Sequence, residues 1–88
     1  MFEVIVSRKA EKGLDNAEPK VRARLLELLE ELKTNPVPAD KYDVTKISGS
    51  DSNYRVRLGR HRALYNVGWN EKRVKVYDID RKKDRTYD

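Results

Sequence analysis

The chain has 88 residues, of which 20 are Lys or Arg and 15 are Asp or Glu, so its formal net charge at pH 7 is +5. This length allows one small domain, which we place over residues 1–88. The absence of cysteine excludes disulfides and thiolate chemistry. No apolar run approaches the about 18 residues that a membrane span needs, so we expect a cytoplasmic protein that contacts no membrane.

The positive charge is unevenly distributed along the chain. Residues 1–44 hold 8 Lys or Arg and 9 Asp or Glu, whereas residues 45–88 hold 12 and 6. The whole positive excess therefore belongs to the second half. This polarity indicates that one face of the protein meets a polyanion, although a charged surface that is merely solvated is the alternative.

The N-terminal segment predicts a strand followed by a short helix. Residues 2–6 are apolar and β-branched, which is typical of a strand. Ser7 is a suitable N-cap for a helix over residues 8–15. Gly13 is unfavourable in the interior of that helix and weakens the prediction.

A second helix is the clearest element of the sequence. Pro19 suits its first turn, and Asn35 followed by Pro36 ends it. Apolar residues recur inside it at helical spacing and predict a buried stripe: Val21, Leu25, Leu28, Leu29 and Leu32.

The second half of the chain changes to the periodicity of strands. Residues 54–58 alternate strictly between apolar and basic side chains, and strands over 62–67 and 73–79 follow after short turns. Residues 44–47 can add a short strand. The order β-α-α-β-β-β predicts an α+β fold, in which two N-terminal helices pack on one face of a small, mainly antiparallel sheet.

Basic side chains gather in the predicted meander. Because alternate residues of a strand share a face, Arg55 and Arg57 project away from the apolar residues and away from the helices. The turn to the next strand brings Arg60, His61 and Arg62 close to them, and a basic tail ends at Tyr87. Several guanidinium groups and an exposed ring are typical of a single-stranded nucleic acid site, where they bind phosphates and stack on bases.

Residues 54–65 (YRVRLGRHRALY), with the order of the elements and the basic tail, resemble the RelE/ParE toxin superfamily, and most of all its archaeal RelE branch. The resemblance covers nearly the whole chain and implies a RelE-like fold. It also implies a toxin of a type II toxin–antitoxin system, a ribosome-dependent endonuclease that inhibits translation. Such a toxin cuts mRNA in the ribosomal A site by attack of the adjacent 2′-OH, without a metal or other cofactor.

The resemblance also implies the partners of the protein. They are a cognate RelB-like antitoxin, the ribosome and mRNA, and DNA is contacted only through the antitoxin complex. We expect the antitoxin to be an extended, partly acidic chain that covers the basic face.

Functional roles follow from the positions that match the family's pattern. The matched positions are Arg55 and Arg57 as basic catalytic residues, Arg62 as the phosphate-binding residue, Arg81 as a stabiliser of the transition state or leaving group, and Tyr87 as the base-stacking residue. If the tail is aligned with a different gap, Arg85 takes the role of Arg81.

The general base is left open by this pattern. Arginine does not readily lose its proton, so the two strand arginines are expected to act electrostatically on the phosphate. His61 has a suitable intrinsic pKa, but we interpret it as a plain turn residue, and Arg60 beside it is a further possible site residue. Tyr87 is a second candidate for the base.

Two other interpretations remain open at this point. A ParE-like protein inhibits DNA gyrase without being an enzyme, and a degenerate member of the superfamily only binds RNA or its partner. Among the other residues, we expect Trp69 and Tyr77 to pack in the core or cap the sheet. The carboxylates Asp78, Asp80 and Asp84 are expected to be charge partners rather than metal ligands.

Overall fold

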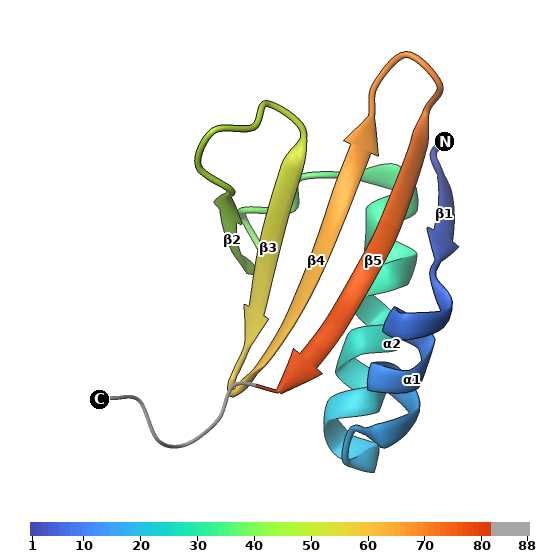
Figure 1. Cartoon of the computed structure of the whole chain (residues 1–88), viewed down its shortest axis with the longest axis vertical. Coiled ribbons are helices and arrows are strands. Elements are labelled where there is room, and N and C mark those ends of the chain that lie inside the picture. The colour runs from blue at the N-terminus through green and yellow to red at the C-terminus, as the bar shows by residue number, and fades with distance from the viewer. Residues whose placement is uncertain (82–88) are drawn as a thin grey trace.

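The computed structural model describes residues 1–81, in which two helices pack against one face of a five-stranded sheet (Figure 1). This arrangement confirms the predicted α+β fold. Neither helix of the described part is long and apolar enough to cross a membrane. In chain order the elements are β1 (Glu3–Val6), α1 (Arg8–Asn16), α2 (Pro19–Thr34), β2 (Asp43–Lys46), β3 (Asn53–Leu58), β4 (His61–Gly68) and β5 (Arg73–Arg81).

The strands lie in the order β1-β5-β4-β3-β2. Only β1 and β5 are parallel, and the other neighbours are antiparallel, so the sheet is mainly antiparallel as predicted. The short strand that the sequence suggested over 44–47 is present as β2, one residue earlier, at the edge of the sheet beside β3. The element order therefore gains one strand over the order β-α-α-β-β-β.

Local signals fix the ends of the helices. The Ser7 hydroxyl accepts a hydrogen bond from the Ala10 amide at 3.1 Å, which confirms Ser7 as the N-cap of α1. Pro19 is the first residue of α2. The Arg22 guanidinium donates to three carbonyls at the end of α1 and in the link to α2, those of Leu14, Asp15 and Ala17, and so satisfies groups that a helix end leaves unpaired.

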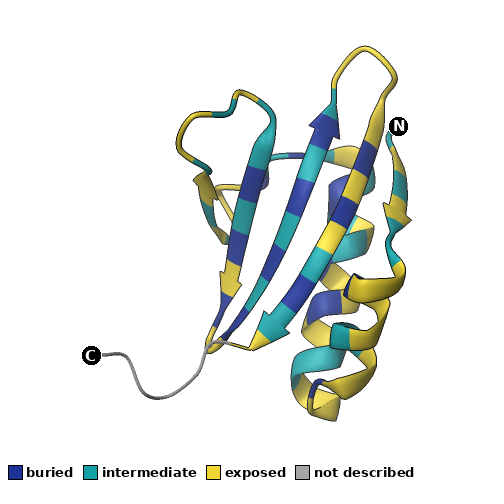
Figure 2. Ribbon diagram, viewed as in Figure 1, coloured by how far each residue is buried: buried dark blue, intermediate teal, exposed yellow. Residues whose placement is uncertain are grey.

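The core lies between the helices and the sheet. Buried and more exposed residues alternate along β3 and β4, as Figure 2 shows in its alternating blue and teal bands. In the predicted leucine stripe, Val21 and Leu29 are only partly buried. The buried hydrophobic residues are Ala10, Ala17, Leu25, Leu28, Leu32, Tyr54, Val56, Leu58, Ala63, Tyr65, Val67, Val74, Val76 and Ile79.

A β-bulge interrupts β5. Leu64 pairs with Asp78 whereas the next residue, Tyr65, pairs with Val76, so Tyr77 has no partner on β4. One extra residue on a strand reverses which side chains face each side of the sheet from that point on. Val74 faces the helices before the bulge, and Ile79 does so after it.

Tyr65 ties the centre of the sheet to the loop after α2. Its ring is fully buried and stacked on Tyr54, with centroids 5.7 Å apart, and its hydroxyl donates to the Pro36 carbonyl at 2.7 Å. We expect Tyr65→Phe to lower the free energy of unfolding by about 1–2 kcal/mol, because the buried carbonyl loses its donor. Chemical denaturation measures this loss, and Tyr42→Phe is the control, since no hydrogen bond joins that hydroxyl to residues 1–81.

The same substitution should change the response to alkaline pH. Burial raises the pKa of the Tyr65 hydroxyl, so the folded protein keeps this proton at pH values where the unfolded chain, with a pKa near 10.0, loses it. Above about pH 10 the folded state therefore binds more protons, and the free energy of unfolding falls as pH rises. The advantage of the wild type over Tyr65→Phe should shrink between pH 9 and 11, and a constant difference would contradict this account.

Candidate functional site

Three neighbouring arginines lie on the face of the sheet that the helices leave uncovered, here called the open face. Arg55 and Arg57 alternate with buried residues along β3, and Arg62 on β4 pairs with Arg57. Residues that pair across antiparallel strands project to the same side, so these three form one group, the arginine cluster. The structure thus brings three of the predicted site residues together, on the face that strand alternation predicted.

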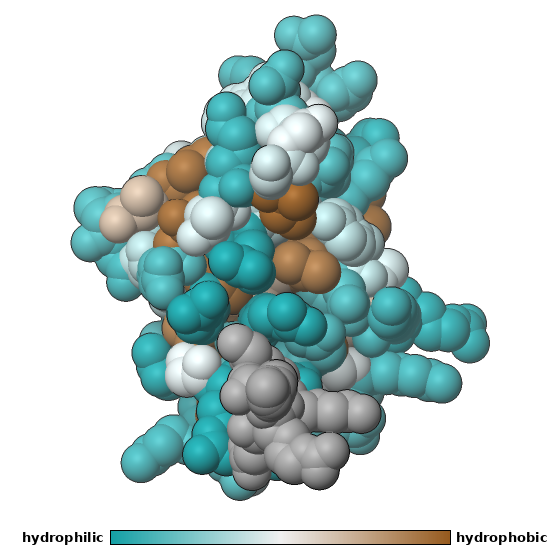
Figure 3. Space-filling model, turned by 60° about the vertical axis from the view of Figure 1, so that its left-hand side comes forward, coloured by the Kyte–Doolittle hydropathy of each residue, from teal (hydrophilic) through white to brown (hydrophobic). Residues whose placement is uncertain are grey.

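Three carboxylates lie near the arginine cluster on the open face, and a fourth, Glu3 of β1, pairs with Arg73 of β5 farther along the same face. Asp43 on β2 pairs with Arg57, Asp80 on β5 pairs with Arg62, and Asp78 lies two residues before Asp80 on the same side. The open face therefore carries acidic as well as basic side chains, which the charge distribution along the chain did not indicate. Figure 3 brings the β2 edge toward the viewer and shows mostly hydrophilic side chains around smaller hydrophobic areas.

The strongest polar contact of the open face joins Arg62 to Asp80. Nε of Arg62 donates to Oδ1 of Asp80 at 3.0 Å, and Nη2 donates to Oδ2 at 3.1 Å. This is the paired geometry in which guanidinium and carboxylate bind most strongly. The hydrogen bonds to Asp80 raise the pKa of Arg62 despite the opposing effect of burial. The two side chains are 34% and 37% exposed, so the pair is still accessible to solvent.

The other carboxylate of β5 has a different partner. Asp78 forms an ion pair with Lys9 of α1 at 3.7 Å. The interpretation of Asp78 and Asp80 as charge partners is thus confirmed, whereas Asp84 lies outside the described residues. Arg55 and Arg57 form no ion pair with any residue in the range 1–81. An anion can therefore bind Arg55 and Arg57 without first displacing a carboxylate.

The opposite face of the sheet holds His61 and Arg81. His61 is the first residue of β4, is only 8% exposed and pairs with Arg81 at the end of β5. It is therefore a buried strand residue on the helix side, and its interpretation as a plain turn residue is wrong. The reason is that the turn consists of only two residues, Gly59 and Arg60, and Gly59 has the positive φ (61°) that such a tight turn uses.

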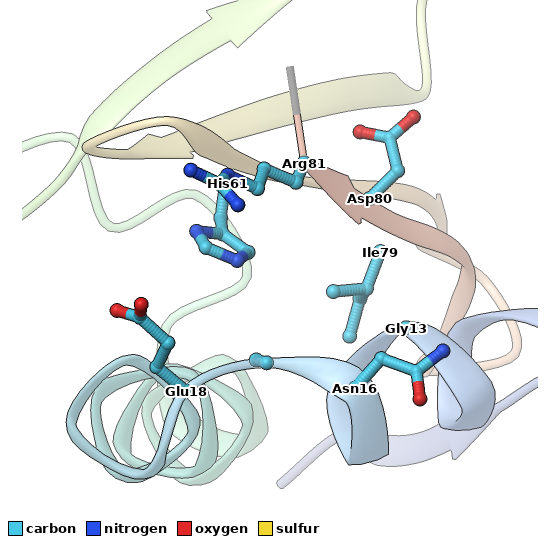
Figure 4. A pocket seen from close by; sticks show the side chains of 8 residues that line it. Gly13, Asn16, Glu18, His61, Ile79, Asp80 and Arg81 are labelled. Carbon is cyan, nitrogen blue, oxygen red and sulfur yellow. The ribbon is translucent and has the colours of Figure 1, made fainter. Parts of the chain in front are cut away.

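A hollow of about 380 Å³ lies beside these two residues, where the link between the helices meets the end of the sheet. Figure 4 shows the His61 ring and the Glu18 carboxylate inside it, Ile79 pointing toward α1, and Asp80 pointing to the other side. The sheet thus separates His61 from the arginine cluster. Arg81 is at the same end of the sheet as Arg62 but on the other face.

The remaining predicted site residues are Arg60, Arg85 and Tyr87. Arg60 is exposed in the turn between β3 and β4. Arg85 and Tyr87 lie outside the described residues. Two aromatic residues were expected to pack in the core or cap the sheet. Trp69 is half-exposed and makes an edge-to-face contact with Phe2, with ring centroids 5.8 Å apart, so it caps one end of the sheet, whereas Tyr77 is exposed at the bulge and is not part of the core.

Sequence reasoning missed that Asp43 and Asp80 share a face with the arginines. Asp43 lies outside the strand predicted over 44–47, although it directly precedes the β-branched residues Val44 and Thr45 and could have extended that strand. Asp80 carried no usable signal, because strict alternation from Val74 and Val76 puts it on the buried face. Only the bulge at Tyr77 brings it to the open face.

A relative of known family identifies this chain, although no family model matches its sequence. A protein of Methanocaldococcus jannaschii named "Putative toxin RelE1" is 37% identical over 81 residues, which cover 92% of this chain and 90% of that protein.

Solved structures show the same fold. The archaeal RelE–RelB complex from Pyrococcus horikoshii OT3 contains a chain with a TM-score of 0.84 and 30% identity, covering 96% of this chain and 98% of that one. A chain of the intact E. coli RelBE toxin–antitoxin complex has a TM-score of 0.77 at 22% identity, with coverage of 97% and 100%. By its sequence identity and its architecture, the chain belongs to the RelE family of toxins.

Proposed function

We propose that this protein is the toxin of a type II toxin–antitoxin system, which acts in the cytoplasm by cutting mRNA in the ribosomal A site and so inhibits translation. The observation that carries the proposal is the arginine cluster, Arg55, Arg57 and Arg62, on a sheet face that no helix covers. Guanidinium groups in fixed positions bind phosphates by paired hydrogen bonds. Membership of the RelE family supplies the link to a toxin.

The proposed reaction needs positioning and charge rather than a cofactor. The 2′-oxygen attacks the adjacent phosphorus, the bond to the 5′-oxygen breaks, and the products are a 2′,3′-cyclic phosphate and a 5′-hydroxyl. Arg55 and Arg57, which form no ion pair with a carboxylate in residues 1–81, stabilise the extra negative charge of the pentavalent transition state. Arg62 holds the phosphate in line.

The proton acceptor for the 2′-OH is not among these arginines, because arginine keeps its proton in proteins. His61 is separated from an RNA on the open face by the sheet itself, so we assign it no part in proton transfer. Tyr87 keeps its two proposed roles, stacking on the base and accepting the proton. Arg81, or Arg85 in its place, is proposed to stabilise the leaving group, and Arg81 must reach around the end of β5 to do so.

We also propose a RelB-like antitoxin as the partner that holds the toxin inactive. The similar chain from Pyrococcus horikoshii was solved as a complex of RelE with RelB, and a chain of the same fold at 20% identity was solved in a RelB-RelE complex from Methanococcus jannaschii. An extended acidic chain over the open face would neutralise Arg55 and Arg57. DNA would be contacted only through that complex.

A reconstituted translation system tests the proposed function. Ribosomes are stalled with a defined codon in the A site of a 5′-labelled mRNA, purified protein is added, and the cleavage position is read by primer extension. We expect a cut within that codon, in the presence of EDTA at a concentration that the ribosomes tolerate, and no cut in the same RNA without ribosomes.

The other interpretations have distinct outcomes in the same set of assays. Intact mRNA together with inhibition of supercoiling by purified gyrase would favour a ParE-like inhibitor. Intact mRNA together with tight binding of the protein to the stalled ribosome would identify a degenerate member of the family. Either result contradicts the proposed endonuclease.

A further inference from the structure

We propose that Asp80 is a positioning residue, which fixes the guanidinium of Arg62 so that the donors at its tip hold the RNA phosphate. This inference rests on the proposed function. It assigns a role to a carboxylate that lies on a face expected to bind an anion, where simple electrostatics would disfavour it.

The geometry of the pair leaves the phosphate-binding edge of Arg62 available. A guanidinium has five N–H donors. Asp80 accepts one from Nε and one from Nη2, which occupies the side edge of the group. Two donors on Nη1 and one on Nη2 remain, and they form the outer edge that can bind two oxygens of a phosphate side by side. Asp80 therefore orients Arg62 without using the donors that a phosphate needs.

On both strands, a residue next to the pair is anchored in the core. Arg62 and Asp80 are cross-strand partners, and the next residues in register, Ala63 and Ile79, are 1% and 2% exposed. The two Cα atoms are thus fixed by packing, and the carboxylate restricts the flexible arginine side chain between them. Without Asp80, the arginine side chain would lose its rotational freedom only when it holds the phosphate. We expect this entropic cost to lower the cleavage rate about three- to tenfold.

Positioning and simple charge effects predict opposite changes in cleavage. If Asp80 only repels RNA, its removal should strengthen binding and speed cleavage, because one negative charge leaves the surface. If Asp80 positions Arg62, its removal should slow cleavage even though binding is unchanged or tighter. Binding and cleavage measured separately on the same variant distinguish the two.

The test compares Asp80→Asn with Asp78→Asn in single-turnover cleavage of ribosome-bound mRNA. Asp78 is a matched control, because it lies on the same strand and face and its replacement makes the same change in charge. Its ion-pair partner is Lys9, and it acts on Arg62 through its charge and not through a hydrogen bond. We expect Asp80→Asn to lower the maximal rate about three- to tenfold without weakening binding. Asp78→Asn should keep the wild-type maximal rate, and Asp80→Glu should restore part of the rate lost in Asp80→Asn.

A double-mutant cycle separates positioning from a general loss of structure. Adding Asp80→Asn to Arg62→Ala should not lower the rate further, because the side chain to be positioned is gone, and it should recover the part of the loss that comes from the unpaired carboxylate facing the RNA. An equal loss in both backgrounds, or an unchanged or faster rate in Asp80→Asn, would overturn the proposal.

The pairing can also be observed without activity. In the wild-type protein the Nε–H signal of Arg62 should exchange slowly with water in NMR spectra, and in Asp80→Asn it should exchange as fast as that of an exposed arginine. A rapidly exchanging signal in the wild type overturns the proposal even if the message is cut. A slowly exchanging signal in a protein that leaves the message uncut rejects the proposed function instead, and with it any role of Asp80 in cleavage.

Discussion

Replacing Arg62 with alanine should reduce cleavage of ribosome-bound mRNA about 100- to 1000-fold, the loss typical of removing one fixed donor from a transition-state site. Two effects add up at this position. The phosphate loses its paired hydrogen bonds, and the Asp80 carboxylate, now without the two donors at 3.0 and 3.1 Å, faces the RNA as an uncompensated negative charge. The measurement is the single-turnover rate at saturating protein.

Matched variants show whether the loss comes from this site. Arg24→Ala removes the same charge from an exposed position of α2, on the other layer of the molecule, and should cut at the wild-type rate. Arg62→Lys keeps the charge but cannot form the paired contact, so its rate should lie between that of Arg62→Ala and that of the wild type. An Arg62→Ala protein that folds normally and cuts as fast as the wild type would exclude Arg62 from the site.

The layout of the fold could be predicted from the sequence because its signals are local. The strict alternation of residues 54–58 gives both the strand and its buried face, and the spacing of the leucines gives α2. Ser7 and Pro19 mark the helix starts by their own chemistry. The arginines of β3 were placed correctly because no irregularity separates them from the apolar residues that define the core side.

The contents of the open face could be predicted only in part, because two of its features depend on pairing between strands. The face on which His61 lies follows from its pairing with Leu58, which in turn depends on a two-residue turn. The bulge at Tyr77 has no signature in the sequence of β5, and it decides that Asp80 meets Arg62 while Arg81 goes to the helix side. Alternation without the bulge would exchange these two residues.

Gly13, which weakened the prediction of α1, has a structural reason to be there. A Cβ at this position would overlap the backbone carbonyl of Ile79, so α1 can approach the end of β5 only with glycine. Ile79 turns toward the helix because of the bulge, and the two features therefore belong together. A glycine that is unfavourable for the helix by itself is favourable for the contact between helix and sheet.

Gly13→Ala should therefore lower the free energy of unfolding, although alanine is the better helix former by about 1 kcal/mol. Crowding of a packed interface costs about 1–3 kcal/mol and more where backbone must move. Because the overlapping atom belongs to the backbone, we take a crowding cost at the upper end of this range, which leaves a net loss of roughly 2 kcal/mol. In a domain of this size each kcal/mol lowers Tm by about 4–8 °C. Thermal unfolding followed by circular dichroism measures it.

The sign of the change is the test, because helix propensity and crowding predict opposite directions. Lys12→Ala is the control within the same helix, since Lys12 is exposed and its replacement should change stability by less than about 0.5 kcal/mol. A Gly13→Ala protein more stable than the wild type would mean that α1 does not approach Ile79 this closely. Loss of stability in Gly13→Ala alone would support the close contact that places α1 over the end of β5, just behind the bulge that turns Asp80 toward Arg62.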